Sequence, residues 1–175
     1  ESGKCTLCGE ESFGTGSSHL REKDGLWAVL AWLSIMEHTG QSVAQLLEAH
    51  WKRFGRSYYQ RHDYEGLPID RAKEGIEAAR KRLPGLKGES FGSLRVVRAG
   101  DFKYRDPVSG ELVRSQGLRI FLRGGHRVVA RLSGTDTSNA TLRVYLERYE
   151  KRDVLRNVDE MLRMVRLRAH GSYSM

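Results

Sequence analysis

Long apolar runs are missing from this sequence of 175 residues, and it does not open with the pattern of a signal peptide. No apolar run is long enough to cross a bilayer, which argues against a helical membrane protein. Without a signal peptide nothing argues for export, so we expect a cytoplasmic protein with no membrane partner. The first residue is Glu1 and not a methionine, which leads us to expect a processed or excised piece.

Cysteine is scarce, and the sequence contains only Cys5 and Cys8. Their C-x-x-C spacing could open a zinc site or a redox pair, but a zinc site needs a second pair of ligands. None follows at the usual spacing, and His19, the nearest histidine, does not complete a site. We therefore expect reduced, structural cysteines in a cytosolic protein, and no metal ligands in this chain.

Acidic residues are outnumbered, since 30 lysines and arginines face 22 aspartates and glutamates, for a net charge of +8. This excess favours anionic partners, either nucleic acid or a phosphorylated small molecule. The basic residues are spread through the chain and form no tail or block, which argues against nucleic acid. A standalone basic binding module for nucleic acid or another polyanion is kept as the alternative.

Residues 1–57 contain little strand pattern. A loop over 9–25 is rich in glycine and charged groups, and it is either a solvated loop or a loop that binds a polyol. We predict a helix over 26–36 with Asp24 as its cap and Gly40 at its end, then a second helix that begins at Ser42 and stops at Gly55. The first helix is apolar on nearly all sides, which is typical of a buried helix. We expect residues 1–57 to be part of a larger α/β domain.

Residues 58–175 have the pattern of a complete domain. Tyr58 to Tyr64 predicts an exposed strand or a linker, and Asp70 is expected to cap a helix that ends near Arg82. The glycine pair at 124–125 predicts a two-residue hairpin turn. Further strands are predicted near 94–98, 117–123, 126–132 and 141–149, with a last helix over 154–168. The class is α+β, a four-stranded, mostly antiparallel sheet with helices on one face.

A small polar loop, Ser133 to Asn139, lies between two of these strands, with Arg131 before it and Arg143 after it. Its hydroxyls and backbone N–H groups suit an anion, and Gly134 lets the backbone approach a ligand closely. Arginine binds phosphate through paired donors, so two flanking guanidinium groups would complete a phosphate site. Composition alone favours an ordinary surface turn instead.

Three stretches carry a family resemblance: CGEESFGTGSSHLREKDGLWAVL from Cys8 to Leu30, YRDPVSG from Tyr104 to Gly110, and RLSGTDTSNATLRVY from Arg131 to Tyr145. They resemble the α-D-phosphohexomutases, and most closely the phosphoglucomutase branch. The resemblance implies a four-domain isomerase that interconverts glucose 1-phosphate and glucose 6-phosphate. Residues 1–57 would be the end of its third, sugar-binding domain. Residues 58–175 would be its fourth, phosphate-binding domain, with a fold like that of the TATA-box-binding protein.

The resemblance also implies roles for single residues. In the sugar loop, Glu10 and Ser12 would contact sugar hydroxyls, and Lys23 would lie near the reacting hydroxyl as a proton-transfer group. The form Glu-Glu-Ser-Phe-Gly looks like that of the glucose-specific branch. The non-reacting phosphate of the substrate would be held by residues of the second loop and its flanks: Arg131, Ser133, Gly134, Thr135 and Arg143.

Two elements of the family are not found in this sequence: the phosphoserine motif Thr-Ala-Ser-His-Asn-Pro and the metal loop Asp-Gly-Asp-Gly-Asp. The resemblance assigns the phosphoryl donor and Mg²⁺ to the other domains. We therefore expect this chain to be inactive alone, with those domains and a hexose phosphate as its partners. Asp136 stands where the family usually has glycine, and a carboxylate beside a phosphate site is unfavourable unless it points away.

Overall fold

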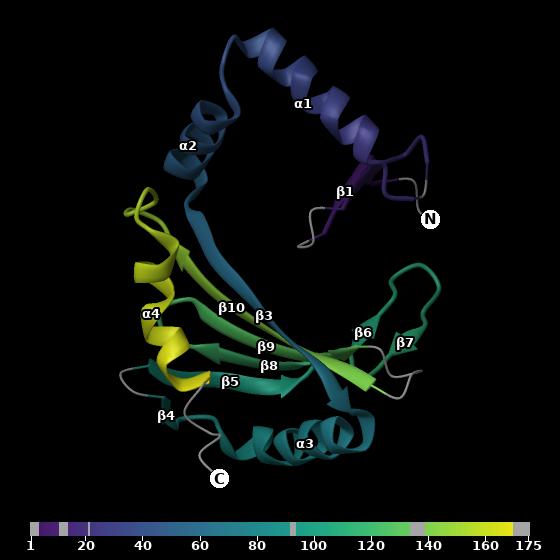
Figure 1. The fold of residues 1–175 in the computed structure, drawn as a ribbon, viewed down its shortest axis with the longest axis vertical. Coiled ribbons are helices and arrows are strands. Elements are labelled where there is room, and N and C mark those ends of the chain that lie inside the picture. The colour runs from purple at the N-terminus through teal and green to yellow at the C-terminus, as the bar shows by residue number, and fades with distance from the viewer. Residues whose placement is uncertain (1–3, 11–13, 21, 92–93, 134–138, 170–175) are drawn as a thin grey trace. The chain divides into compact units, whose positions relative to one another are not determined.

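A computed structural model describes residues 4–10, 14–20, 22–91, 94–133 and 139–169 (Figure 1). The chain divides into two compact units, Glu1–Arg53 and Phe54–Met175, and each is described by itself.

The first unit opens with a short hairpin and continues into two helices. Strands β1 (Leu7–Gly9) and β2 (Thr15–Ser17) pair antiparallel, and they are followed by helices α1 (Gly25–Thr39) and α2 (Val43–Phe54). The expectation of a loop throughout 9–25 was therefore wrong. These strands are too short to show an alternating apolar pattern, so only the backbone pairing reveals them.

Both helices begin and end at the residues that the sequence predicts. The Asp24 carboxylate accepts the Trp27 N–H at 2.9 Å, and Gly40 closes α1 with a left-handed φ of 65°. Ser42 and Gln45 form a reciprocal capping box in which the Ser42 N–H donates to Gln45 Oε1 at 2.8 Å. Gly55, with a φ of 85°, follows the end of α2.

The apolar side chains of α1 are exposed. No residue of α1 is buried, and Leu26 and Leu30 keep 81% and 66% of their surface accessible. Large exposed apolar patches mark surfaces that another part of a protein covers. No helix in the described ranges is both long enough and apolar enough to span a membrane.

The second unit is built on a six-stranded antiparallel sheet in the order β3-β10-β9-β8-β5-β4 (Figure 1). The class α+β is confirmed, with two more strands than the four predicted. The additional strands lie at the two edges, where β3 includes the Tyr58–Tyr64 stretch and β4 is very short. The strands are β3 (Arg56–Pro68), β4 (Ser90–Phe91), β5 (Leu94–Asp101), β8 (Leu118–Leu122), β9 (His126–Ser133) and β10 (Asn139–Glu150), and a separate hairpin joins β6 (Tyr104–Arg105) to β7 (Leu112–Val113).

Both helices of this unit pack on the same face of the sheet. Helix α3 (Ile69–Arg82) places Ile76 against the main core, and a 3₁₀ turn (Leu83–Gly85) follows it. Helix α4 (Val158–Ala169) packs Met161 and Leu162 against Tyr58. Tyr58 shares its face of the sheet with the core residue Leu146, because the pairs Tyr58–Arg148 and Gln60–Leu146 are successive same-side pairs of the β3–β10 ladder. The main core consists of Leu83, Leu86, Leu94, Val96, Leu118, Leu122 and Leu146.

Several local predictions in this unit were wrong for identifiable reasons. Asp70 lies in the first turn of α3, and Pro68 holds the cap position without a side-chain hydrogen bond. Tyr58 is buried, not exposed, because α4 covers it and its hydroxyl donates to the Asp153 carbonyl at 2.7 Å. Helix α4 begins at Val158, so Leu155 lies before it and is exposed.

The β8–β9 turn is one residue longer than predicted. Leu122 pairs with His126, which leaves three residues in the turn, and both of its glycines have a positive φ. The glycine pair therefore locates this turn correctly but does not fix its length.

Candidate functional site

Glu10 and Lys23 meet at the loop end of the β1–β2 hairpin, just beyond the Gly9–Thr15 pair. Lys23 Nζ lies 2.7 Å from Glu10 Oε2, and the Glu10 N–H donates to the Gly14 carbonyl at 2.9 Å. A Cβ at Gly14 would lie 2.5 Å from Lys23 Cδ, so the missing side chain makes room for the lysine stem. The hairpin thus brings together the predicted sugar contact, Glu10, and the predicted proton-transfer residue, Lys23, which are 13 residues apart in the sequence.

A second group of side chains ties the hairpin to the start of α1. His19 lies between Ser17 and Asp24: its Nδ1 contacts the Ser17 hydroxyl, and its Nε2 is 3.1 Å from Asp24 Oδ2. The His19 ring stacks on Trp27 with 5.8 Å between centroids. The Trp27 N–H, followed by His19, lowers the pKa of Asp24, which keeps this cap ionised at neutral pH. The segment that carries Lys23 is therefore anchored next to the hairpin.

The stretch from Tyr104 to Gly110 forms most of the β6–β7 hairpin. The Asp106 carboxylate accepts the N–H groups of Ser109 and Val108 at 2.7 and 2.8 Å, and these bonds lower the pKa of Asp106. Arg105 donates to the Gly110 carbonyl at 2.8 Å. The contacts are those of a self-contained turn.

Arg131 and Arg143, the two arginines that flank the polar loop, stand directly opposite each other on the β9–β10 ladder. The Cβ atoms of directly opposed residues lie about 5 Å apart on the same face of a sheet. Both guanidinium groups therefore extend from the same face. Like charges in this position repel each other. An anion bound between them would turn that repulsion into two attractive contacts.

Two residues that the sequence did not single out flank this pair. Asp63 on β3 is the other cross-strand partner of Arg143, with 3.7 Å from Asp63 Oδ2 to Arg143 Nε, and its Oδ1 is 3.0 Å from Arg61 Nε. Gly117, just before β8, lies beside Arg131, and a Cβ there would approach Arg131 Cγ to 2.9 Å. No sequence signal identifies either residue. Their positions beside Arg143 and Arg131 depend on how strands that are distant in the sequence pair with one another.

An open pocket of about 340 Å³ lies at this end of the sheet, against the face covered by α3. Its lining includes Arg131, four residues of α3 and the segment that leads into β8. Among the α3 residues, Arg80 is held by Asp101 at 2.8 Å and also pairs with Glu77. The lining residues are Lys73, Ile76, Glu77, Arg80, Ser115, Gln116, Gly117, Leu118, Ala130, Arg131 and Leu132.

Some of the predicted site residues lie outside the described residues, namely Ser12, Gly134, Thr135 and also Asp136. Ser133 ends β9, and its hydroxyl donates to the Thr141 carbonyl at 3.4 Å across the ladder. The described flanks of the polar loop are therefore strand residues with fixed partners, and the roles predicted for the loop itself stay predictions.

Metal ligands are not grouped in the part of the chain that the structure describes. No set of three or more His, Cys, Asp or Glu side chains there could hold a metal ion. Cys5 and Cys8 are both exposed and form no disulfide. The Mg²⁺ that the resemblance implies does not fit these residues, so no metal-dependent step is assigned to them.

Comparisons with known proteins cover nearly the whole chain. The family model "Phosphoglucomutase-1, C-terminal domain" matches residues 56–171. The model "Phosphoglucomutase/phosphomannomutase, alpha/beta/alpha domain III" matches residues 1–54. A phosphoglucomutase of Rhizobium radiobacter is 53% identical over 150 residues, which is 86% of this chain and 28% of the relative. A cytoplasmic phosphoglucomutase of Solanum tuberosum is 43% identical over 170 residues, 86% of this chain and 29% of the relative.

A solved structure has the same fold. The chain superposes on parafusin (pp63), an exocytosis-sensitive phosphoprotein and phosphoglucomutase of Paramecium, in its open form. The TM-score is 0.78 at 37% identity, over 91% of this chain and 28% of that one. The chain thus spans less than a third of the length of these proteins.

Proposed function

Because this chain belongs to the phosphoglucomutase family, where it corresponds to the C-terminal portion, we propose that it supplies sugar and phosphate binding to an isomerase. Completed by the rest of such a protein, it would interconvert glucose 1-phosphate and glucose 6-phosphate. The observation that carries the proposal is the direct opposition of Arg131 and Arg143 beside the polar loop.

The second unit holds the phosphate that does not react. Arg131 and Arg143 supply paired donors from adjacent strands, and Ser133, Gly134 and Thr135 add hydroxyl and backbone N–H donors. The cross-strand pairing supports this role, because it fixes two positive charges at the same end of the sheet before any ligand arrives. A prearranged site has less conformational entropy to lose on binding.

The first unit contacts the sugar through Glu10 and Ser12, and Lys23 moves a proton at the hydroxyl that exchanges phosphate. The ion pair between Lys23 and Glu10 supports a shared site for these two residues. A sugar hydroxyl that donates to the Glu10 carboxylate would compete with Lys23 for it. A crowded, desolvated site then favours the neutral amine, which can accept a proton.

The phosphoryl donor and Mg²⁺ belong to other domains of the completed enzyme in this proposal. The chain alone would be inactive, because phosphoryl transfer depends on positioned charge neutralisation. Its partners would be a hexose phosphate and those domains, and we place it in the cytoplasm on the name of the potato relative.

A chimeric enzyme tests the proposal. Residues 1–175 replace the corresponding portion of the Rhizobium radiobacter relative, and the conversion of glucose 1-phosphate is measured. We expect an active chimera, an inactive isolated chain, and loss of activity when Arg131 and Arg143 are both changed to Gln. A folded chimera with no activity, or one whose activity is unaffected by the double change, would contradict the proposal.

A further inference from the structure

The face of the six-stranded sheet that carries no helix is strongly basic. Ladder register and side-chain alternation place Arg95 and six further arginines on it, against two carboxylates, Asp63 and Glu147. Of these six, Arg131 and Arg143 flank the polar loop, and Arg61 pairs with Asp63, as Arg143 also does. The other three lie on neighbouring strands and are called the arginine cluster here: Arg98 on β5, Arg119 on β8 and Arg127 on β9.

The cluster surrounds Phe121. In the ladders Phe121 pairs with Arg98 on one side and with Arg127 on the other, and Arg119 comes two residues earlier on the same face of β8. Residues that are direct or diagonal cross-strand neighbours lie within reach of long side chains. The three guanidinium groups can therefore converge on one ligand.

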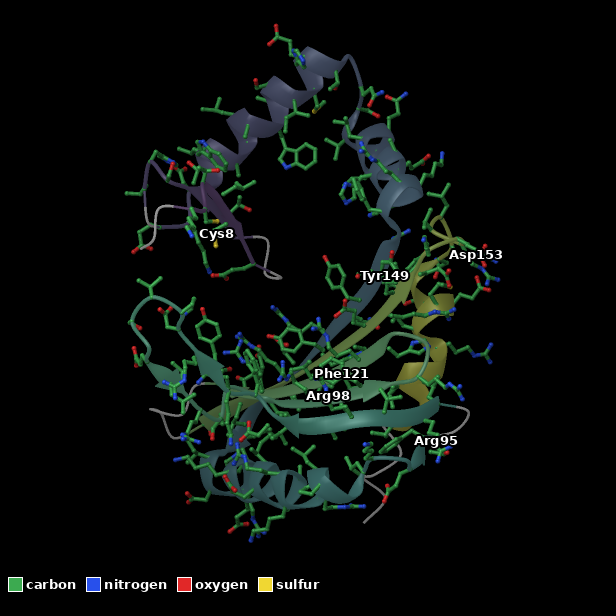
Figure 2. All side chains as sticks on the ribbon, turned by 180° about the vertical axis from the view of Figure 1, so that it is seen from behind. Cys8, Arg95, Arg98, Phe121, Tyr149 and Asp153 are labelled. Atoms are coloured by element: carbon green, nitrogen blue, oxygen red, sulfur yellow. The ribbon has the colours of Figure 1, made fainter. Side chains whose placement is uncertain are left out.

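Aromatic rings hold two of these side chains in place. The Arg98 guanidinium lies 4.2 Å from the centroid of Phe121, and the two are labelled next to each other in Figure 2. The Arg119 guanidinium lies 4.1 Å from the centroid of Phe102 and 5.7 Å from that of Phe121. Such contacts fix the planes of the groups without neutralising their charge.

The charge of the cluster is not balanced within the described part of the chain. Arg127 pairs with Glu147, but no carboxylate there forms a hydrogen bond or ion pair with Arg98 or Arg119. The Nε of Arg119 is buried without an acceptor. Burial, followed by the charges of Arg98 and Arg127, lowers the pKa of Arg119. Asp101 acts in the opposite direction, but its carboxylate is held by Arg80.

We infer that Arg98, Arg119 and Arg127 form a second anion-binding site, which takes the phosphate group of inorganic phosphate or of a phosphate monoester. Arginine forks match the geometry of phosphate, and a bound dianion would relieve the mutual repulsion of the cluster. Three converging guanidinium groups suit a compact anion. The site is separate from Arg131 and Arg143, so it does not depend on the function proposed above.

Titration of a variant without the loop arginines tests this site. In the ¹⁵N-labelled chain carrying Arg131→Gln and Arg143→Gln, inorganic phosphate is added at constant ionic strength. The Nε–H signals of Arg98 and Arg119 should shift and saturate. Adding Arg119→Gln should weaken phosphate binding about tenfold or more, as expected for loss of one charge-assisted contact.

A matched control is Arg123→Gln, which removes the same charge from the exposed β8–β9 turn, outside the cluster. It should leave phosphate affinity unchanged. If Arg119→Gln does not fold, Arg98→Gln at an exposed position replaces it with the same expectation. Glucose 6-phosphate is the second probe, and it distinguishes the two candidate ligands. If it binds the cluster as tightly as inorganic phosphate does, the ligand is inorganic phosphate. If it binds more tightly, the ligand is a phosphate monoester.

Three results would overturn the inference. The cluster signals could fail to saturate, Arg123→Gln could weaken binding as much as Arg119→Gln, or a short oligonucleotide could shift these signals where inorganic phosphate does not. Failure of the phosphate site at Arg131 and Arg143 would be a different result. It is detected by comparing the phosphate affinity of the wild type with that of the Arg131→Gln, Arg143→Gln variant. The two proposals can therefore fail independently.

Discussion

Arg131 and Arg143 face each other across the β9–β10 ladder, on either side of a loop that connects their strands. Two like charges in this position destabilise a sheet. Their positions are fixed by the register of the sheet, and Asp63 beside Arg143 offsets only part of the charge. The anion binding that we propose for this pair would offset the repulsion that remains.

Gly117→Ala should weaken phosphate binding by displacing Arg131, although Gly117 itself is not proposed to contact the ligand. Gly117 has a φ of 150°, and a Cβ would press on Arg131 Cγ at 2.9 Å and on the Ala130 carbonyl at 3.2 Å. The matched control is Gly110→Ala, since Gly110 also has a positive φ, 74°, but open space around it. Each change should cost about 1 kcal/mol of stability through its backbone conformation, and only Gly117→Ala should also lower phosphate affinity. Denaturant unfolding and phosphate titration of both variants would show this, and equal affinities would rule out the effect on Arg131.

Lys23→Ala, in the completed enzyme, should lower kcat more than it raises KM, which is the signature of an interaction made in the transition state. Lys52→Ala is the control, because Lys52 also pairs with a carboxylate, Glu48, but on α2. Glu10→Ala should weaken discrimination among hexose phosphates. Steady-state kinetics with glucose and mannose phosphates measure all three variants. A change in KM alone for Lys23→Ala would leave Lys23 as a phosphate contact and remove the proton-transfer role.

Helix α1 should be weakly protected in the isolated chain. Its apolar side chains are exposed, so its hydrogen bonds open without the loss of buried contacts. Amides of residues 26–36 should exchange faster than those of β8, β9 and β10 in hydrogen-exchange experiments. Strong protection throughout 26–36 in a proven monomer would contradict this expectation.

His126 should make the second unit less stable in mild acid. The side chain is 8% exposed, and burial, followed by the charge of Arg148, lowers the pKa of His126. Because the folded state binds this proton less readily than the unfolded state, stability should fall as the pH drops below the ordinary histidine pKa of about 6.5. Urea unfolding at pH 7 and pH 5 should show a smaller loss for His126→Gln than for the wild type. An equal loss in both proteins would exclude His126 as the cause.

Local signals in the sequence predicted much of the fold. Asp24, Gly40, Ser42 and Gly55 mark the helix ends of the first unit, because capping depends on neighbouring residues only. Alternating apolar residues likewise located the four central strands. The burial of Tyr58 and the late start of α4 could not be predicted, because both depend on how distant segments pack.

The candidate site shows the same limit. The polar loop and its two arginines are visible as a motif, and the resemblance assigns them a ligand. The opposition of Arg131 and Arg143, and the positions of Asp63 and Gly117 beside them, follow from ladder register. Composition and spacing do not specify register between strands that are distant in the sequence.

The most direct test of phosphate binding by Arg131 and Arg143 is a titration of the chain with glucose 6-phosphate at constant ionic strength, followed by NMR at the amides of 131–133 and 139–143. We predict that Arg131→Gln and Arg143→Gln each weaken binding about tenfold or more, since each removes a charge-assisted hydrogen bond, while Arg123→Gln has no effect. Equal affinity of the wild type and the Arg131→Gln, Arg143→Gln double variant at these amides would contradict the site.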